Sequence, residues 1–208
     1  MNILIRIPNW LGDAVMATFA LEILYKTYPQ AHFYIVGSIV SGELFRHYPN
    51  TTIIFDKSKQ SKYRLLNLYH LAKKIPRCDL AFTFQNNFLS ALFLAFNRSK
   101  KRIGYSNQVR SIFLHIAPKR PKNTHEVLRF SQLVETIVPN HHLPPKLYLK
   151  KPKTLPKKLS QKLAGINAGA AFGSAKRWKE EYFAQVIAFL LKEDFTIFLF
   201  GTESEGVI

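Results

Sequence analysis

Residues 2–37 read NILIRIPNWLGDAVMATFALEILYKTYPQAHFYIVG, and this stretch predicts the fold of the chain. Residues 2–7 form a short apolar run that is typical of a buried strand. In residues 14–28 the apolar side chains recur at helical spacing and leave Glu22 for solvent, which predicts an amphipathic helix. Residues 32–37 predict a second strand that ends in glycine. The stretch is therefore expected to be a β-α-β unit with a polar loop after its first strand.

The same alternation of strands and helices continues along the chain. Further strands are predicted at residues 52–55, 80–84 and 102–105, and further helices at 41–47, 65–75, 88–96 and 124–138. Such alternation indicates an α/β fold with a parallel sheet covered by helices on both faces. Ligands of these sheets bind beyond the carboxyl ends of the strands. The loops at 8–13, 85–87 and 104–110 are expected to open on that edge.

A change of composition predicts a domain boundary. Residues 144–158 carry four prolines and six lysines, which is typical of an extended, solvated linker. After it the pattern restarts, with strands expected at 163–167 and 195–201 and a helix at 180–192. The predicted organisation is an N-terminal Rossmann-like domain at 1–143, a linker at 144–158 and part of a second domain at 159–208.

Composition narrows the class of protein. Apolar residues make up 47% of the 208 residues and charged residues 21%, as in a globular protein. A single cysteine excludes an internal disulfide, and we predict a cytoplasmic protein because neither a signal peptide nor an apolar run of membrane-spanning length is present. The net charge of +17 favours an anionic partner, namely nucleic acid, an anionic membrane face or an acidic substrate.

The loop PNWLGD at residues 8–13 contains the first candidate catalytic residue. It joins a predicted strand to a predicted helix, but its one glycine does not form a dinucleotide-binding fingerprint. Asp13 stands where a helix N-cap is expected, and capping is favoured on position alone. The same placement suits a general base directed into a cleft. Trp10 either shapes a pocket wall or packs on the sheet edge.

Residues 167–178, NAGAAFGSAKRW, form the second candidate site. Small residues such as Gly169 and Ser174 let backbone amides approach an anion, and Lys176 adds a positive charge. The alternative is an ordinary loop with a basic end. The sequence thus predicts either a phosphate site or a simple connection here.

Other polar groups have structural interpretations beside functional ones. His125 and Arg129 are four residues apart and are expected to share one helix face, either to hold an acidic group or only to face solvent. The amides of residues 85–87 either bind sugar hydroxyls or cap the next helix. The basic run 119–122 is interpreted as a solvated face. No metal site or resident cofactor is expected, because no histidine has acidic or cysteine partners at ligand spacing.

Three segments in register resemble the ADP-heptose:lipopolysaccharide heptosyltransferases of glycosyltransferase family 9. They are IRIPNWLGDAVM with TYPQAHFYIVGS, then FQNNFLSAL with KRIGY, then INAGAAFGSAKRW with YFAQVIAFL and IFLFG. The resemblance runs over essentially the whole chain. It implies a GT-B architecture of two Rossmann-like domains, and its AFGSAKRW segment is most similar to heptosyltransferases that add the second heptose.

The resemblance also implies roles for residues. The position of Asp13 matches the family's base, and Lys176, with Gly169 and Ser174 in its loop, matches the site of the donor phosphates. The acceptor is expected to meet Asn9, Trp10, Gly12, Asn86, Arg110, His125 and Arg129. The implied partners are ADP-heptose, an acceptor of Kdo and heptose on lipid A, and the anionic inner leaflet as a peripheral support. No metal is implied.

Four alternatives remain open at this point. One is addition of the first heptose, and another is a related transferase of the same family. A third is a shortened, non-catalytic remnant, because family members are expected to continue past residue 208 into a segment that contacts the adenosine. The fourth is a basic nucleic-acid-binding protein, which the sequence disfavours because it contains no recognition-module motif.

Overall fold

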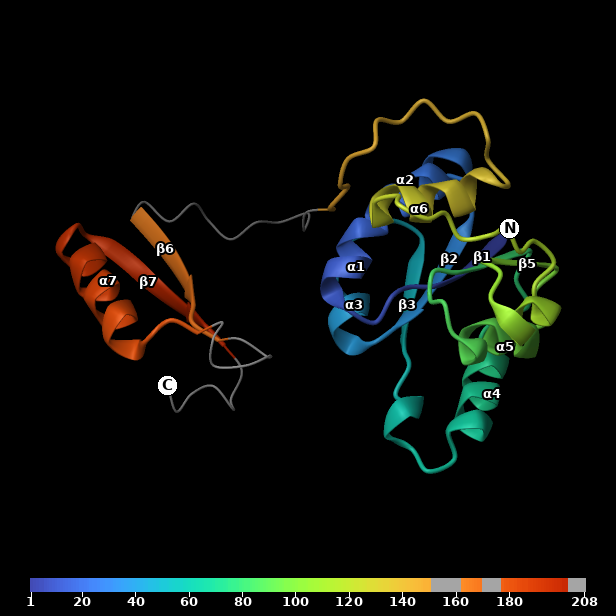
Figure 1. Cartoon of the computed structure of the whole chain (residues 1–208), viewed down its shortest axis with the longest axis horizontal. Helices are drawn as coiled ribbons and strands as arrows, with labels where there is room; N and C mark the ends of the chain where they lie inside the picture. Colours follow the sequence, from blue (N-terminus) through green and yellow to red (C-terminus); the bar gives the residue numbers. More distant parts are fainter. Residues whose placement is uncertain (151–161, 170–176, 202–208) are drawn as a thin grey trace. The chain divides into compact units, whose positions relative to one another are not determined.

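The chain forms two compact units, Met1–Lys153 and Thr154–Ile208. The computed structural model (Figure 1) describes residues 1–150, 162–169 and 177–201. The boundary between the units falls within the segment 144–158, where the composition of the sequence changes. Each unit has its own sheet, so the two are described one after the other.

The first unit contains a five-stranded sheet in which every strand is parallel to its neighbours, which confirms the predicted α/β fold class. Its strands are β1 (Asn2–Arg6), β2 (His32–Gly37), β3 (Thr51–Phe55), β4 (Leu80–Thr83) and β5 (Lys101–Gly104). The spatial order is β3-β2-β1-β4-β5. The chain therefore moves outward from β1 in one direction and then returns to build the sheet in the other. This places the reversal of strand order between β1 and β4.

Helices connect the strands of the first unit. They are α1 (Leu11–Met16), α2 (Thr18–Thr27), α3 (Ile39–Glu43), α4 (Arg64–Lys74), α5 (Phe88–Phe96) and α6 (Glu126–Glu135), with short 3-10 turns η1 (Ser58–Gln60) and η2 (Gln108–Phe113). The predicted helix at 14–28 starts earlier and divides into α1 and α2 at Ala17. The hydroxyl of Thr18 donates to the carbonyl of Val15 at 2.7 Å, and such local bonds compete with a regular helix.

The apolar core lies on both faces of the sheet because successive strand residues point to opposite sides. On β1, Ile3 and Ile5 pack with residues of α1, α2 and α6, whereas Leu4 packs with residues of α4 and α5. All three side chains are fully buried. A continuous apolar run in the sequence thus becomes a central strand covered on two faces.

The start of the predicted linker packs on the first unit instead of running through solvent. Tyr148 lies against the core with its ring 6.1 Å from that of Phe19, and its backbone amide donates to the Thr18 hydroxyl at 3.1 Å. Lys150 forms an ion pair of 2.8 Å with Glu22. Glu22 is therefore buried, and its predicted exposure to solvent is wrong because this segment covers it. Residues 151–158 of the predicted linker lie outside the described residues.

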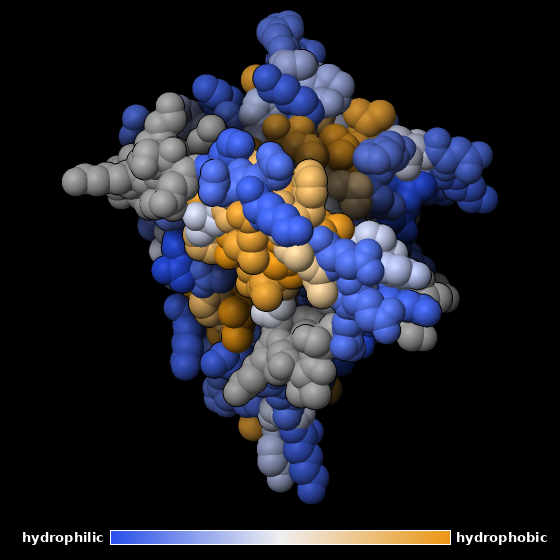
Figure 2. All heavy atoms as spheres, turned by 90° about the vertical axis from the view of Figure 1, so that its left-hand side faces the viewer, coloured by the Kyte–Doolittle hydropathy of each residue, from blue (hydrophilic) through white to orange (hydrophobic). Residues whose placement is uncertain are grey.

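The second unit contains β6 (Lys162–Asn167), α7 (Glu180–Lys192) and β7 (Phe195–Phe200). The two strands pair in parallel in a sheet of their own. Ile166 is its one buried apolar residue among those that the structure describes, and α7 buries none. In Figure 2 an apolar area framed by hydrophilic residues faces the viewer.

Candidate functional site

A hollow of about 270 Å³ opens at the carboxyl edge of the first unit's sheet. The loops that follow β1 and β4 form its centre, and these strands are neighbours at the point where the strand order reverses. This is the usual position of a ligand site in an open parallel sheet. The hollow is lined by Pro8, Asn9, Trp10, Asp13, Phe84, Gln85, Asn86, Asn87, Arg120, Glu126 and Phe130.

Asp13 lines this hollow from the first turn of α1. The helix begins at Leu11 with Trp10 at the N-cap, so the predicted capping role of Asp13 is wrong. The side chain is partly exposed, and no described residue forms a hydrogen bond or an ion pair with its carboxylate. The carboxylate can therefore accept a hydrogen bond from a molecule in the hollow.

A buried polar network fixes the loop before Asp13. Gln85 is 9% exposed, and its Nε2 donates to the carbonyl of Ile7 at 2.7 Å and to Oδ1 of Asn9 at 3.3 Å. Its Oε1 accepts from Nε of Arg6 at 3.4 Å. Arg6 in turn forms an ion pair of 2.5 Å with Asp56, both side chains being almost fully buried. Gln85 thus holds the β1 and β4 loops together instead of presenting its amide to a ligand.

The remaining amides of residues 85–87 have different tasks. Asn87 accepts from the backbone amide of Ser90 at 2.9 Å and caps α5, which confirms the structural alternative for this residue. Asn86 is exposed, lines the hollow and accepts a 2.5 Å hydrogen bond from Nη1 of Arg110. Asn86 is therefore the amide of this group that combines exposure with a cationic partner.

Arg110 lies beneath the surface beside Asn86. It is 2% exposed, and burial lowers its pKa to about 10. Its Nε and Nη2 atoms are buried without a hydrogen-bond partner among the described residues. Gly104 makes room for it, because a Cβ there would lie 3.1 Å from Nη2. The bulk of the guanidinium is packed inside, and its link to the hollow runs through Asn86.

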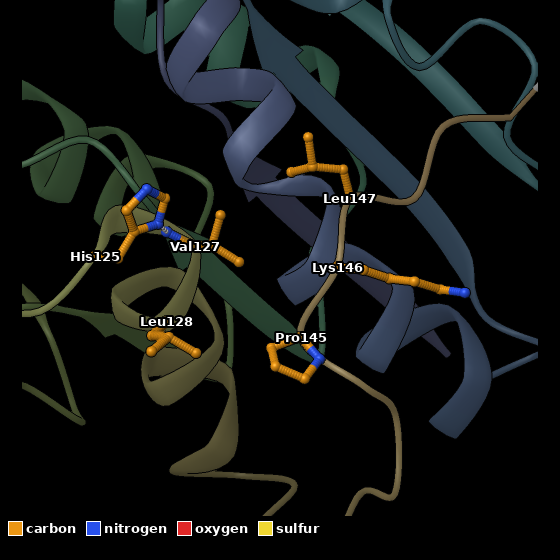
Figure 3. A pocket seen from close by; sticks show the side chains of 6 residues that line it. All are labelled: His125, Val127, Leu128, Pro145, Lys146 and Leu147. Carbon is orange, nitrogen blue, oxygen red and sulfur yellow. Dashed lines mark hydrogen bonds between the residues drawn. The ribbon is translucent and has the colours of Figure 1, made fainter.

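His125 and Arg129 occupy different surroundings. His125 is the N-cap of α6 and precedes the helix, so the prediction that the two share one helix face is wrong. Its Nδ1 accepts from the backbone amide of Val127 at 3.3 Å, and the ring lines a second, mainly apolar hollow of about 270 Å³ beside Leu147 (Figure 3). Arg129 forms a short ion pair with Glu126. The structure does not bring His125 and Arg129 into one anion site.

Two charged residues of the hollow were not identified from the sequence. Arg120 pairs with Glu126 at 2.8 Å, and both line the hollow that contains Asp13. Arg120 is exposed, as the interpretation of the basic run 119–122 as a solvated face expects, but its ion pair with Glu126 also places it at the hollow. The sequence feature that could have indicated this pair is Glu126, an acidic residue near the start of a predicted helix and six positions after Arg120. Spacing alone does not reveal that this pair returns to the sheet edge.

The second unit holds the other predicted site. Gly169 follows β6 and is partly exposed. Ser174 and Lys176 lie outside the described residues. Trp178, at the end of this loop, packs its ring 5.2 Å from Tyr182 and 5.4 Å from Phe183 at the start of α7.

Gly12 of the first unit is exposed, and open space surrounds the position of a Cβ there.

Two features are absent from the described part of the chain. None of its helices combines the length and the apolar character needed to cross a bilayer. Within the same residues, no three or more His, Cys, Asp or Glu side chains gather in a way that would hold a metal ion.

Comparison with known proteins gives one family. Residues 68–207 match glycosyltransferase family 9, described as heptosyltransferase. The chain is 35% identical over 207 residues to the lipooligosaccharide heptosyltransferase 2 of Campylobacter jejuni subsp. jejuni serotype O:6. That alignment covers 97% of this chain and 60% of the relative, so the chain spans about three fifths of the relative's length.

Solved structures show the same fold at low sequence identity. The glycosyl transferase family 9 structure from Veillonella parvula DSM 2008 matches with a TM-score of 0.80 at 19% identity, over 99% of this chain and 64% of that chain. The E. coli heptosyltransferase WaaC with ADP-2-deoxy-2-fluoro heptose matches with a TM-score of 0.74 at 16% identity, over 99% and 70%. These two likenesses support the predicted GT-B type of fold.

Proposed function

Because the chain belongs to glycosyltransferase family 9, we propose that the protein of which it forms part transfers L-glycero-D-manno-heptose from ADP-heptose to the inner core of lipopolysaccharide. Addition of the second heptose is the favoured step, since the relative that is 35% identical is named heptosyltransferase 2. The observation that supports catalysis in this chain is the Asp13 carboxylate, which lines the hollow at the β1–β4 edge and has no hydrogen-bond or ion-pair partner among the described residues.

Asp13 is the proposed general base. An acceptor hydroxyl loses its proton to this carboxylate while its oxygen forms a bond to the anomeric carbon of the heptose. The bond from that carbon to the diphosphate breaks, and ADP leaves on the opposite face with the electron pair. The result is inversion at the anomeric carbon. The transfer is proposed to need no metal, and the cationic Lys176 with the loop of Gly169 and Ser174 stabilises the charge that grows on the diphosphate.

The acceptor is proposed to lie against the hollow. Asn9, Trp10 and Asn86 line it together with Asp13, which supports their assignment to sugar hydroxyls. Gly12 leaves space beside them. Arg110 is assigned a supporting role through its bond to Asn86. For His125 and Arg129 the proposal is weaker, because His125 lines the second hollow and Arg129 pairs with Glu126.

The site of action is proposed to be the cytoplasmic face of the inner membrane. The acceptor is a lipid with acidic sugars, and the net charge of +17 complements both it and an anionic leaflet. Attachment is proposed to be peripheral.

Replacement of Asp13 by Asn tests the proposal. The measurement is heptose transfer from ADP-heptose to a core acceptor that carries one heptose, with this chain and with the form extended by its downstream coding sequence. We expect Asp13→Asn to lower kcat by about 10²- to 10⁴-fold in the active form, with little change in donor binding. Glu43→Gln, which removes an exposed carboxylate from α3, is the matched control and should leave kcat unchanged. Normal turnover by Asp13→Asn would reject the base assignment.

A further inference from the structure

The segment from η1 to α4 exposes apolar side chains that the proposed transfer does not use. Tyr63 is 66% exposed, and Leu65 and Leu66 are each 55% exposed. In α4 only Leu68 and Ala72 are buried, so one face of the helix packs on the sheet and the other presents leucine to solvent. In Figure 1 the chain descends from β3, turns and returns along α4, so that this segment protrudes from the body of the unit.

Neighbouring elements extend this exposed apolar surface. α5 packs beside α4, and η2 packs beside α5. Phe88 at the start of α5 is 45% exposed, and its ring lies 5.4 Å from that of Phe113 in η2. Six of the exposed apolar residues in and beside these elements form what we call the apolar rim: Tyr63, Leu65, Leu66, Phe88, Val109 and Ile112.

The apolar rim lies toward the same edge of the sheet as the hollow with Asp13. In a parallel sheet every segment that follows a strand begins at the carboxyl edge. Tyr63 follows β3, Phe88 follows β4, and Ile112 follows β5. A surface that engaged the apolar rim would therefore meet the protein near the mouth of the hollow.

The charge around α4 identifies the kind of surface. Residues 57–78 contain no Asp or Glu, but they contain the cations Lys57, Lys59, Lys62, Arg64, Lys73, Lys74 and Arg77. Among these, Lys59 and Lys62 are exposed immediately before α4, and Lys73 is exposed in its last turn. Apolar and aromatic side chains flanked by lysines are typical of a helix that lies in the interface of an anionic bilayer. Nucleic acid would match the charge but not the exposed leucines.

We propose that the apolar rim and the lysines beside α4 form a docking surface for an anionic membrane. The leucines and Tyr63 enter the headgroup region, and the lysines contact acidic lipids. This goes beyond attachment through charge alone, and it rests on the proposed function only in placing the acceptor in that membrane. A lipid-linked acceptor would then reach the hollow without leaving the bilayer.

Vesicle co-sedimentation of the chain tests the docking surface. The vesicles contain phosphatidylcholine alone or phosphatidylcholine with phosphatidylglycerol, and no sugar nucleotide is present. We expect binding to the anionic vesicles and weakening by salt. The double variant Leu65→Gln/Leu66→Gln should bind about tenfold more weakly. Lys59→Gln/Lys62→Gln should bind about 30-fold more weakly, which corresponds to about 1 kcal/mol per lysine.

Matched controls test whether exposed apolar residues or lysines elsewhere in the chain affect vesicle binding in the same way. Ile39 and Val40 of α3 are 52% and 61% exposed, and Ile39→Gln/Val40→Gln should bind like the wild type. Lys26→Gln/Lys192→Gln removes two exposed lysines from other helices and should change binding less than twofold. Trp emission gives a second measurement: Tyr63→Trp should shift to shorter wavelength on anionic vesicles, measured against the wild type, and Val40→Trp should not.

Several outcomes would overturn the proposal. It is wrong if Leu65→Gln/Leu66→Gln binds vesicles as well as its α3 control, or if vesicles without phosphatidylglycerol bind equally well. It is also wrong if these leucines convert a dimer of the chain to a monomer while vesicle binding persists, because the surface would then join two copies. Vesicle binding by the chain, together with no heptose transfer by the extended form, would reject the proposed function and leave the docking surface standing.

Discussion

The two units are built from the same alternation of strand and helix, yet they bury their apolar side chains to very different extents. In the first unit Phe93 of α5 and Phe82 of β4 are fully buried. In the second, Phe189 of α7 is 62% exposed and Phe200 of β7 is 61% exposed. The difference shows that a β-α-β pattern specifies its elements but buries them only when further elements cover both faces of the sheet.

The largest expected effect is on folding of the isolated units. Residues 1–153 alone should give one cooperative thermal transition, because their core is covered on both faces of the sheet. Residues 154–208 alone should lack a cooperative transition, because Ile166 is their one buried apolar residue among those described. Circular dichroism and amide dispersion in NMR measure both. A cooperative transition in the shorter piece would remove the contrast between the units.

A matched pair of phenylalanines compares the two units within the whole chain. Phe93→Ala should lower the free energy of unfolding by about 3–5 kcal/mol, because it leaves a cavity and removes a ring that lies 4.6 Å from the Arg6 guanidinium. Phe189→Ala should change it by less than about 0.5 kcal/mol. Urea unfolding measures both values. Equal costs would show that other parts of the protein cover α7 in solution.

The buried ion pair of Arg6 and Asp56 sharpens the comparison, since it belongs to the first unit alone. Asp56→Asn should lower the free energy of unfolding by about 3 kcal/mol, because it leaves Arg6 charged and almost fully buried. Burial of Asp56 opposes its ionisation, but the attraction of Arg6 and the hydrogen bonds from Ser58 outweigh burial and hold its pKa below the ordinary value of 3.8.

The lowered pKa of Asp56 also predicts the dependence of stability on pH. A lowered folded-state pKa means that this stabilisation is fully present above pH 3.8 and is lost as pH falls through the lower folded-state value. The acid limb of the unfolding free energy of residues 1–153 should therefore flatten in Asp56→Asn, as measured by denaturant titrations at several pH values. An unchanged acid limb would contradict the assignment.

A smaller loss of stability than at Phe93 or Asp56 is expected at Gln85. Gln85→Leu should cost about 2 kcal/mol, because the carbonyl of Ile7 and the side chain of Asn9 lose their buried donor. If Gln85 positions the loop that leads to Asp13, kcat should fall more than the KM for the acceptor rises. Asn97→Leu, which removes another buried amide donor but at the far end of α5 and away from the hollow, is the control and should leave kcat nearly unchanged. A change in KM alone would make Gln85 a purely structural residue.

Much of the fold was predictable because its signals are local. The strands at β1, β2 and β4 lie within two residues of their predicted limits, since short apolar runs between loops indicate buried parallel strands. The two loops that form the hollow were also predicted to meet, because the carboxyl ends of parallel strands share one edge. The roles of Asp13 and of the acceptor residues remain predictions.

The wrong predictions depended on a contact between distant residues or on the limit of a helix, and residue spacing gives neither. Glu22 has the spacing of a solvent-facing residue, but Tyr148 and Lys150 return to cover it. The His125–Arg129 pair follows helical spacing, but the helix starts one residue too late to include His125.

The amino-acid sequence by itself determined the α/β class, the alternation of elements and the polar loops at the sheet edge, because periodicity and turn residues act over a few neighbouring positions. The tertiary structure alone decided the order β3-β2-β1-β4-β5 and, with it, the contact of Gln85 with Ile7 and Asn9. Gln85 lies more than 70 positions along the chain from both Ile7 and Asn9. Their meeting depends on how every strand competes for a place beside β1, and no local pattern encodes that competition.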